Sequence, residues 1–318
     1  MTTPHRTALS RRSAMMATAG LPAMLPAMMT SVAFAPAARA EPPAAAGPGA
    51  QARSFVLGDL RVVTALGGSA INPDPIRTFG LDADPDEFRA ISERNFIPWD
   101  RTGSSFTLTF LRMADALVLF DAGLSAEGNA ASMALAGIRP EDVTHVVLTH
   151  MHPDHVGGLM QDGRPVFANA RLIAPRAEND YWAANPGDAY RTAVQPLIAD
   201  ARLIADGDEI LPGIRAEAAP GHTPGHTTYL VESRGQRLLI SGDSFNHHVY
   251  SVQRPDWKVR FDIDKDQAIA TRKAVLARLA RERLPFIGYH MPFPALGFIA
   301  GDGAGGYRHV PASYQFDA

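Results

Sequence analysis

The chain has 318 residues, of which 46% are hydrophobic and 20% are charged, and its formal net charge is -3. This length suits one large domain or two small ones, and the mild acidity argues against nucleic acid as a partner, which would require a basic face. The chain contains no cysteine, which excludes disulfides, thiolate ligands and cysteine nucleophiles. A bound metal would therefore need imidazole and carboxylate ligands.

Residues 1–40 differ in character from the rest of the chain. They begin with arginines and no acid, continue with an uncharged alanine-rich stretch, and end in the small-x-small pattern of Ala38 and Ala40. This pattern is typical of a cleaved export signal. The pair Arg11-Arg12 in SRRSAM resembles a twin-arginine motif, although the usual large apolar residues are missing. We expect a signal peptide and a periplasmic or secreted protein, with no stable membrane insertion after processing.

The uncharged stretch is long enough to cross a membrane, so a transmembrane anchor is the alternative to a cleaved signal. Gly20, Pro22 and Pro26 interrupt it, and alanine is only weakly hydrophobic, so we favour the cleaved signal. Residues 41–53 are rich in Pro, Ala and Gly and predict a flexible lead-in. No further linker follows, and we assign residues 54–318 to one catalytic domain.

Short apolar runs alternate with helical stretches in this domain. Runs on either side of Gly58-Asp59 and of residues 113–115 predict two hairpins. We expect helices at residues 129–138, 176–185, 188–200 and 264–284. We expect further strands at residues 144–150, 215–222, 227–233, 237–243 and 285–290. Asp264 at an N-cap, with Gln267 three residues later, marks the start of the last helix. Helices between groups of strands indicate an α+β domain with two sheets packed face to face.

Four candidate metal ligands follow an apolar β-branched run in the segment VVLTHMHPDHVGGL: His150, His152, Asp154 and His155. Residues two apart in extended backbone point the same way, so His150 and His152 can converge on one metal. Pro153 stops the strand, and we place Asp154 and His155 in the turn that follows. One short segment thus offers two pairs of ligands, a pattern that indicates a metal site.

Four ligands on one turn cannot complete two metal sites, so further ligands should follow later strands. The segment APGHTPGH supplies His222 and His226, LLISGDSF supplies Asp243, and FIGYH supplies His290. Each follows or ends an apolar run, and loops at strand ends collect at one edge of a sheet. We therefore expect these residues to meet the first cluster.

These motifs, H-x-H-x-D-H, G-H-T-P-G-H, G-D and a late strand-end histidine, resemble those of the metallo-β-lactamase superfamily over roughly residues 54–318. The segments THMHPDHVGGLM, GHTPGHTTYLVES and MPFPALGFI are similar to the methyl parathion hydrolase branch, which lies close to lactonases and arylesterases. The resemblance implies a four-layer αββα sandwich. It also implies a hydrolase that acts on a small-molecule substrate.

The resemblance further implies two Zn²⁺ ions, with other divalent transition metals accepted. The ligands it implies are His150, His152 and His222 for one ion, Asp154, His155 and His290 for the other, and Asp243 as the bridge. Two neighbouring ions lower the pKa of a bridging water, so that hydroxide is available to attack a polarised C=O or P=O bond. Asp154 would orient this hydroxide and take up its proton. His226 would lie behind the ligands.

The substrate pocket is predicted to be aromatic and uncharged. Its candidate residues are Trp182, Phe245, Tyr250 and Phe293, which would favour neutral esters with good leaving groups. Trp182 aligns with an aromatic wall of the parathion hydrolase pocket, or is a core tryptophan on a helix. Asn246 stands where homoserine lactonases usually place a tyrosine, which weakens a strict lactonase interpretation. We expect His247 and His248 at the surface or behind the ligands.

The leading hypothesis is an exported dinuclear zinc hydrolase of esters, lactones or organophosphate triesters. A mononuclear iron persulfide dioxygenase of the same fold uses the same ligands and is the alternative, together with a β-lactamase. The segment GDGAGG at residues 301–306 matches a dinucleotide-binding pattern, but a strand-like stretch follows it instead of a helix, so we predict a turn. The sequence is compatible with a homodimer.

Overall fold

The computed structural model describes residues 49–303, 306–313 and 316. The predicted signal peptide, residues 1–40, and most of the predicted lead-in, residues 41–53, lie outside the described residues. The first strand, β1, begins at Ala52, so the last two residues of the expected lead-in already belong to the folded domain. The reason is that Ala52 and Arg53 pair with Ala65 and Thr64 in an antiparallel ladder.

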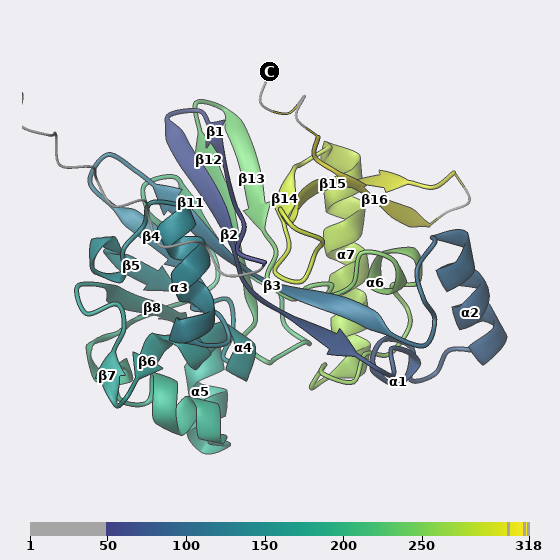
Figure 1. The fold of residues 1–318 in the computed structure, drawn as a ribbon, viewed down its shortest axis with the longest axis horizontal. Helices are drawn as coiled ribbons and strands as arrows, with labels where there is room; N and C mark the ends of the chain where they lie inside the picture. The colour runs from purple at the N-terminus through teal and green to yellow at the C-terminus, as the bar shows by residue number, and fades with distance from the viewer. Residues whose placement is uncertain (1–48, 304–305, 314–315, 317–318) are drawn as a thin grey trace, which may run out of the picture. The chain divides into compact units, whose positions relative to one another are not determined.

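Two seven-stranded sheets form the centre of the domain (Figure 1). The first has the order β1 (Ala52–Leu57), β2 (Leu60–Asn72), β3 (Thr102–Arg112), β4 (Leu117–Phe120), β5 (His145–Val147), β8 (Arg171–Pro175) and β9 (Arg202–Ile204). The second has the order β10 (Glu209–Leu211), β11 (Ile214–Ala218), β12 (Thr227–Ser233), β13 (Gln236–Ile240), β14 (Phe286–Ile287), β15 (Leu296–Gly301) and β16 (Tyr307–Pro311). A small hairpin joins β6 (Met160–Gln161) to β7 (Arg164–Pro165).

The helices lie outside the two sheets. They are α1 (Ile76–Phe79), α2 (Pro85–Arg94), α3 (Ala126–Leu135), α4 (Pro153–Val156), α5 (Arg176–Ala184), α6 (Tyr250–Gln253) and α7 (Lys265–Glu282). Helix α3 packs on β2, α5 packs on β8 and β9, and α7 packs on β15. Of the described helices, none combines the length and the apolar character that crossing a membrane requires.

The side-chain alternation of the strands divides the core into layers. In β4, Val118 and Phe120 belong to the core shared by the two sheets. Their neighbours Leu117 and Leu119 belong to a second core on the other face, together with Met133 of α3. Successive residues of a strand point to opposite faces, so one short apolar strand serves both layers. This arrangement confirms the predicted α+β fold, with two sheets face to face and helices outside.

Several local predictions are also confirmed. Leu57 pairs with Leu60 across the first predicted turn, and Arg112 pairs with Leu117 across the second. Helix α7 starts after Asp264, whose side chain accepts a hydrogen bond from the backbone N–H of Gln267 at 3.0 Å. Such a cap stabilises a helix by about 1 kcal/mol.

Two other local predictions are wrong, and one is confirmed. Residues 188–200 do not form one continuous helix. A π-type turn at Tyr190–Val194 is followed by Pro196, which has no N–H to continue it, and then by a separate 3-10 turn at Ile198–Asp200. The predicted strand at residues 144–150 ends earlier, at Val147. The pattern at residues 301–306 does lead into a strand, as predicted, since Gly301 of β15 pairs with Tyr307 of β16.

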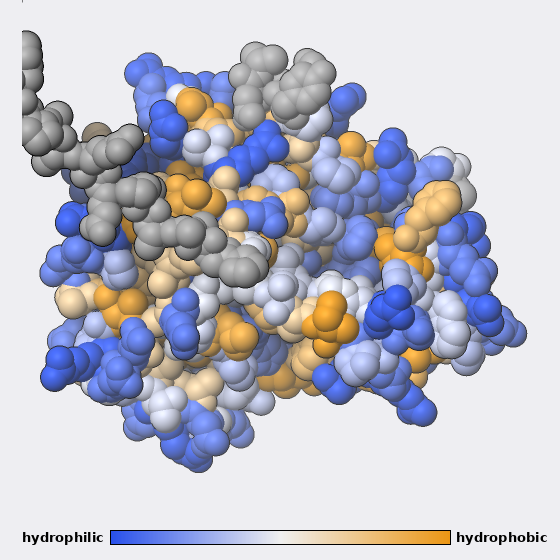
Figure 2. Space-filling model, viewed as in Figure 1, coloured by the Kyte–Doolittle hydropathy of each residue, from blue (hydrophilic) through white to orange (hydrophobic). Residues whose placement is uncertain are grey.

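Hydrophilic side chains cover much of the face shown in Figure 2, and apolar residues occur between them in separate patches. Among the large hydrophobic residues that the structure describes, Phe96 is the most exposed, at 98%, followed by Ile71, at 71%. Single exposed apolar residues are ordinary on protein surfaces. Ile71 is of interest because it lies beside the predicted ligands, as described below.

Candidate metal centre

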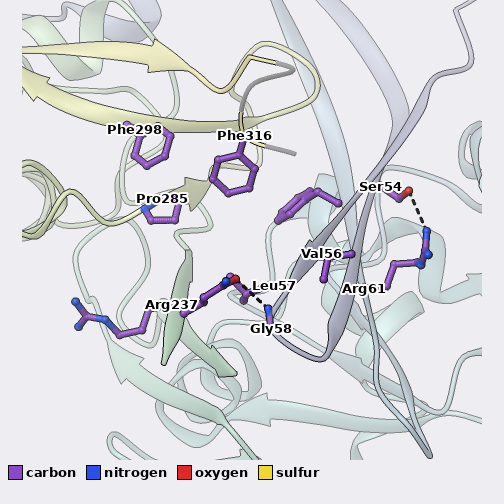
Figure 3. Close-up of a pocket in the computed structure, with 11 residues that line it drawn as sticks. Ser54, Val56, Leu57, Gly58, Arg61, Arg237, Pro285, Phe298 and Phe316 are labelled. Carbon is purple, nitrogen blue, oxygen red and sulfur yellow. Dashed lines mark hydrogen bonds between the residues drawn. The ribbon is translucent and has the colours of Figure 1, made fainter. Parts of the chain in front are cut away.

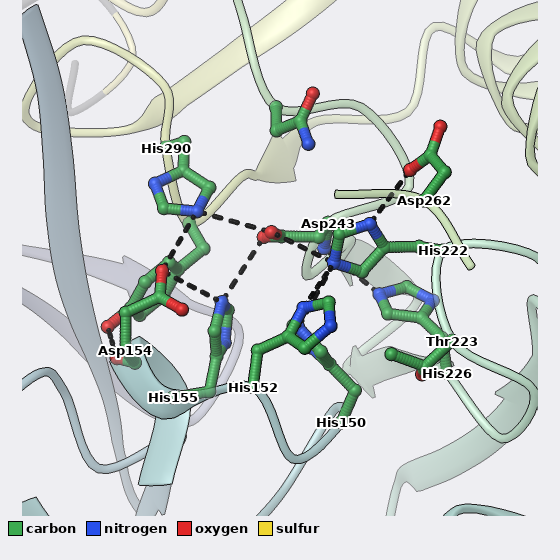
Figure 4. A network of polar contacts seen from close by, with 12 residues as sticks. His150, His152, Asp154, His155, His222, Thr223, His226, Asp243, Asp262 and His290 are labelled. Carbon is green, nitrogen blue, oxygen red and sulfur yellow. Dashed lines mark hydrogen bonds and ion pairs between the residues drawn. The ribbon is translucent and has the colours of Figure 1, made fainter. Parts of the chain in front are cut away.

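Four loops bring the predicted ligands together at one edge of the sandwich (Figure 4). These loops follow β5, β11, β13 and β14. Their ligand side chains form three overlapping groups whose ligand atoms lie within 4.8 Å of one another: His150, His152 and His222; His150, His155 and Asp243; and Asp154, His155 and His290. The structure therefore assembles all seven side chains that the sequence singled out.

The backbone that carries the first cluster differs from the expected one. His150 lies three residues beyond the end of β5 at Val147, and Pro153 begins the one-turn helix α4. Asp154 and His155 are thus in a helical turn, and the His155 ring still packs against that of His150, with centroids 3.9 Å apart. Proline at the first position of a helix has no N–H to leave unpaired, which explains why the turn starts there.

Three imidazoles form the first group. The Nδ1 atom of His152 lies 3.1 Å from Nε2 of His150 and 3.0 Å from Nε2 of His222. The Nε2 atoms of His150 and His222 lie 3.2 Å apart. Nitrogens bound tetrahedrally to zinc at about 2.0–2.1 Å would be separated by roughly 3.3 Å. The three nitrogens are therefore spaced as ligands of one such ion would be.

The hydrogen-bond partners of these rings support the same conclusion. His222 donates through Nδ1 to Asp262 at 2.9 Å, so its Nε2 presents a lone pair. The Thr149 hydroxyl donates to Asp121 at 2.8 Å and can accept from Nδ1 of His150 at 3.0 Å, which leaves a lone pair on Nε2 of His150. Burial, followed by the charge of His155, holds the pKa of His150 well below its usual value. Two facing lone pairs repel each other unless a cation lies between them.

Asp243 lies between the two ligand groups (Figure 4). Its Oδ1 is 3.4 Å from Nε2 of His155, and its Oδ2 is 3.2 Å from His290 and 3.4 Å from His222. Asp154 completes the second group, with Oδ2 3.3 Å from His290 and 3.6 Å from His155. Asp243 thus contacts histidines of both groups, with Oδ2 shared between His222 and His290, and is placed as a bridge.

Two buried atoms of this group have no hydrogen-bond partner: Nε2 of His155 and Oδ1 of Asp243. Buried polar atoms are nearly always satisfied, so this pair is unusual. Both atoms point into the space between the ligands. Imidazole and carboxylate donors fit zinc and other divalent transition metals, and the residues therefore fit a pair of such ions.

The charges of Asp243, His155 and His290 shift one another's pKa values. Burial alone would raise the pKa of Asp243, but the charges of His290 and His155 hold it well below its usual range. Burial alone would lower the pKa of His155, yet Asp243 and Asp121 hold it well above its usual value. The pKa of His290 is raised to about 10 against the effect of burial, chiefly by Asp243. The carboxylates thus create a negative potential that favours cations at these positions.

Asp121 and Asp262 orient the ligands from behind, and the sequence analysis missed both. Asp121 accepts from Nδ1 of His155 at 2.9 Å and from the backbone and hydroxyl of Thr149, each at 2.8 Å. Asp262 accepts from His222 and, at 2.7 Å, from the buried guanidinium of Arg272. Carboxylates in this position fix the tautomer of a ligating histidine. A signal existed only for Asp121, which directly follows an apolar strand.

Glu178 of α5 connects the two histidine-bearing loops. Its Oε1 accepts from the backbone N–H of Met151 at 2.9 Å and from Nε1 of Trp182 at 2.6 Å. Its Oε2 accepts from the Thr223 hydroxyl at 2.7 Å and from the backbone N–H of Gly225 at 2.9 Å. One fully buried carboxylate therefore holds the loop between His150 and His152 against the loop after His222. The sequence predicted this helix but not this function.

His226 lies behind the ligands, as predicted. Its Nδ1 donates to the carbonyl of Ala219 at 3.0 Å, and its Nε2 accepts from the backbone N–H of Asp243 at 2.9 Å. Burial, followed by the charge of His222, lowers its pKa to about 3, which agrees with a neutral ring that can accept. His226 thus positions Asp243.

His247 and His248 also lie away from the ligands. His247 is buried and faces the Thr102 hydroxyl through Nε2 at 3.0 Å. Its Nδ1 accepts from the backbone N–H groups of Val249 and Tyr250 at 3.1 and 3.2 Å. The ring of His248 stacks on that of His247, with centroids 4.8 Å apart. Both residues therefore have structural contacts.

The ligands open onto a cleft of about 580 Å³. Five of them line it: His152, Asp154, His222, Asp243 and His290. The other lining side chains are mostly apolar and include Ile71, Phe79, Phe106, Leu124 and Phe261. The remaining polar lining residues are Asn72, Ser104, Asn246 and Arg260. The cleft thus combines an apolar wall with a cluster of metal-binding groups.

The predicted pocket residues do not line this cleft. Phe245 is fully buried and packs on Phe286, with centroids 5.1 Å apart, and Tyr250 is fully buried and stacks on Phe88 at 4.2 Å. Both predictions are wrong, because these rings point into apolar cores. Phe293 is half-buried and is not among the lining residues.

Trp182 was predicted to be either an aromatic wall of the pocket or a core residue, and its position matches neither fully. Its ring meets His152 edge to face, with centroids 5.8 Å apart, and packs at the border of a core. It does not line the cleft. Trp182 therefore supports a ligand instead of forming a wall for substrate.

A second cavity, of about 720 Å³, lies between the β1–β2 hairpin, β13 and β15 (Figure 3). Its lining includes Val56, Arg61, Arg237, Pro285 and Phe298. It contains no histidine or carboxylate side chain among its lining residues. Volume alone does not make a site, and this cavity lacks the groups that metal chemistry needs.

Comparison with known proteins gives one family. Residues 107–285, more than half of the 318, match the Metallo-beta-lactamase superfamily. An N-acyl homoserine lactonase from a Bacillus species is 35% identical over 122 residues, which cover 37% of this chain and 46% of the relative. The N-acyl homoserine lactonase AttM of Azorhizobium caulinodans is 35% identical over 129 residues, covering 37% of this chain and 47% of the relative. The chain thus spans about half the length of the curated relatives it matches.

Solved structures share the fold at lower identity. AidC, described as a dizinc quorum-quenching lactonase, has a TM-score of 0.76 at 24% identity and is similar over 83% of this chain and 98% of its own. The hydrolase AbOPH has a TM-score of 0.77 at 24% identity, with the same coverage of both chains. These likenesses support the four-layer fold and leave the reaction to be argued from the site.

Proposed function

Because this chain belongs to the metallo-beta-lactamase superfamily, we propose that it is a metal-dependent hydrolase that holds two divalent ions, preferably Zn²⁺. The proposal depends above all on Asp243, whose carboxylate lies 3.2–3.4 Å from histidines of both ligand groups: Oδ2 is near His222 and His290, and Oδ1 is near His155. One ion would be held by His150, His152 and His222. The other would be held by Asp154, His155 and His290.

When bound, two such ions would supply Lewis acidity and a water of lowered pKa. The chain's own residues then orient the reactants. Asp154 lines the cleft and its side chain is 23% exposed, so its carboxylate can position an attacking water and receive the proton. His226 and Glu178 hold the ligand loops in place. A fixed site keeps the attacking water and the scissile bond at the distance and orientation that the reaction needs.

The proposed substrates are esters, lactones or organophosphate triesters. The apolar side chains of the cleft suit an acyl or aryl group. Among the residues that line it, Asp154 and Asp243 are the only carboxylates, and both belong to the ligand set. A poor leaving group would therefore lack a separate acid, and we expect good leaving groups such as nitrophenolate or a strained lactone alkoxide. The curated relatives named above, which are lactonases, support the ester and lactone part of this range.

Metal analysis combined with a substrate panel tests the proposal. The protein is purified, its metal content is measured, and p-nitrophenyl acetate, an acyl lactone, a phosphotriester and a β-lactam are assayed. We expect close to two zinc ions per chain and turnover of the ester, lactone or phosphotriester. One iron per chain, together with oxygen consumption on a persulfide, would support the dioxygenase alternative instead. Turnover confined to the β-lactam would overturn the substrate range.

We also propose export with cleavage of the N-terminal segment, supported by Arg11-Arg12 and by Ala38-x-Ala40 before Glu41. A cleaved signal predicts that the mature protein begins near Glu41. N-terminal sequencing of protein recovered from the periplasm or medium measures this directly. An intact Met1 on a membrane-associated protein would contradict it.

A further inference from the structure

We propose that Arg260 makes one side of the cleft a subsite for a carboxylate, so that the preferred substrates are esters or lactones bearing a carboxylate beyond an apolar spacer. This proposal rests on the hydrolase function proposed above and narrows it. The sequence predicted an uncharged pocket, whereas the cleft contains the positive charge of Arg260. Three features support it: Arg260 lines the cleft, no described carboxylate pairs with it, and apolar side chains surround it.

Arg260 is held at the cleft by its backbone and by a neighbouring ring. Its backbone N–H donates to the carbonyl of Thr78 at 2.8 Å. Its guanidinium lies over the ring of Phe261, 4.7 Å from the centroid. A cation over an aromatic face is attracted by the ring quadrupole, so the contact gives an exposed side chain a preferred orientation. Both residues line the same cleft as His222 and Asp243.

The charge of Arg260 is not neutralised by another described side chain. Two arginines close to it in sequence are paired: Arg254 lies 2.7 Å from Glu87, and Arg272 lies 2.7 Å from Asp262. Within the described part of the chain, no carboxylate oxygen lies within 4.0 Å of Arg260. Asp262, two residues further on, is already occupied by His222 and Arg272. The donors of Arg260 therefore remain available to a ligand.

Arg260 is also the only lysine or arginine among the residues that line the cleft. A guanidinium presents its N–H groups in a planar fork that matches a carboxylate. The carboxylates of Asp154 and Asp243 would be balanced by the bound ions, so they would not repel an anionic substrate. The cleft would thus offer two separate attachment points, the metal pair for the scissile carbonyl and Arg260 for an anion.

Apolar side chains lie around the same cleft and define what would join these two points. Ile71 is 71% exposed, and Leu124 and Phe261 are each 47% exposed. Exposed apolar area of this kind is covered favourably by a hydrocarbon segment. A molecule with a carboxylate, a methylene spacer and an ester or lactone carbonyl would satisfy all three features at once.

The experiment compares two esters that differ only in the terminal group. They are p-nitrophenyl hexanoate and the mono-p-nitrophenyl ester of adipic acid, which has the same six-carbon acyl chain with a carboxylate at its end. The measured quantity is the ratio of kcat/KM for the carboxylate ester to kcat/KM for the neutral ester. It is determined for the zinc-loaded wild type, Arg260→Gln and Arg260→Glu. Arg77→Gln serves as the control, because Arg77 is exposed, has the same charge and does not line the cleft.

We expect Arg260→Gln to lower this ratio about tenfold, the effect of losing one charge-assisted contact, and Arg260→Glu to lower it further. Arg77→Gln should leave the ratio at its wild-type value. The wild-type ratio should also fall as salt is raised from 0.05 to about 1 M, because an exposed charge is screened. A ratio that is the same in wild type and in Arg260→Gln would overturn the subsite while leaving the hydrolase function intact.

A binding measurement separates the subsite from turnover. Adipamate and hexanamide, an amide pair with and without the terminal carboxylate, are titrated calorimetrically into the zinc-loaded protein. Tighter binding of adipamate to wild type, lost in Arg260→Gln, supports the subsite. Equal binding of the two amides to wild type contradicts it. If no ester, lactone or phosphotriester is hydrolysed but adipamate is still preferred, the hydrolase proposal fails and the anion subsite stands.

Discussion

The Nε2 atoms of His150 and His222 face each other at 3.2 Å, and each ring has its other nitrogen directed at a fixed partner. The partner of His150 is the Thr149 hydroxyl, and the partner of His222 is the Asp262 carboxylate. Both Nε2 lone pairs therefore point into the same small space. Folding holds these atoms together although they repel, which is the arrangement expected of ligands preorganised for a cation.

The first prediction follows from this repulsion. Removing metal with a chelator should lower the melting temperature by about 10 °C, because an ion that binds only the folded state stabilises it by several kcal/mol. Differential scanning calorimetry before and after chelation measures the shift. Adding Zn²⁺ back should restore the original value, and an unchanged melting temperature would argue against ligand preorganisation.

A second prediction concerns Asp243. Because its oxygens face both ligand groups, Asp243→Ala should reduce the metal content of the purified protein and lower ester kcat/KM by a factor of about 10³ or more. Inductively coupled plasma mass spectrometry and steady-state kinetics test both parts. Asp100→Ala, at an exposed position, is the control. Full metal occupancy with normal turnover in Asp243→Ala would remove Asp243 from the bridge.

The ligand set was predictable from sequence because its members lie next to features that sequence reveals. His150, Asp243 and His290 each come shortly after or at the end of a short apolar run, and strand ends in a layered fold collect at one edge. The two-sheet architecture was predictable for a related reason, since apolar runs and hairpin turns indicate strands, and helices between groups of strands indicate layers. The order of the strands was not predicted. Neither inference required knowledge of which side chains touch.

The supporting residues were not predictable, because their functions exist only through contacts between distant segments. Glu178 looks like any acid on an amphipathic helix, and its four donors come from three parts of the chain. The same limit explains the error at Phe245. It lies two residues after Asp243, but its ring turns into the core against Phe286, and proximity in sequence does not give side-chain direction.

A third prediction concerns Glu178. In Glu178→Gln, the amide NH₂ replaces an oxygen that accepts two hydrogen bonds, so it faces donors that it cannot satisfy. We expect a loss of about 2–4 kcal/mol of stability and a zinc affinity reduced by about 10- to 100-fold. Zinc titration with a competing chelator measures the affinity. Asp180→Asn, exposed on the same helix, is the control, and a zinc affinity equal to that of wild type would show that Glu178 does not position the ligands.

Gly225 gives a fourth prediction. A Cβ atom at this position would lie 2.0 Å from the backbone nitrogen of Glu178, and backbone cannot move aside as a flexible side chain can. Gly225→Ala should therefore cost about 3 kcal/mol or more and displace the loop that carries His222. Gly103→Ala is the matched control, because a Cβ there meets nothing within 4 Å. Urea denaturation of both variants would contradict the prediction if they were equally stable.

The last prediction concerns pH and a histidine outside the ligand set. Burial lowers the pKa of His309 to about 4, with a smaller contribution from the charge of His248, whereas an unfolded histidine titrates near 6.5. Between these values the unfolded chain binds a proton that the folded chain does not. Stability from this residue is therefore complete above about pH 6.5 and is lost as the pH falls toward about 4, by an amount on the order of 2 kcal/mol.

The variant His309→Gln isolates this contribution because glutamine does not titrate. The free energy of unfolding is measured by urea denaturation for both proteins at pH 8 and at pH 5. At pH 8 the difference between them reports only packing, since His309 is then neutral in both the folded and the unfolded state. At pH 5 the wild type should have lost stability relative to the variant by about 1–2 kcal/mol. An identical difference at the two pH values would show that His309 takes up a proton in the folded domain as readily as in the unfolded chain.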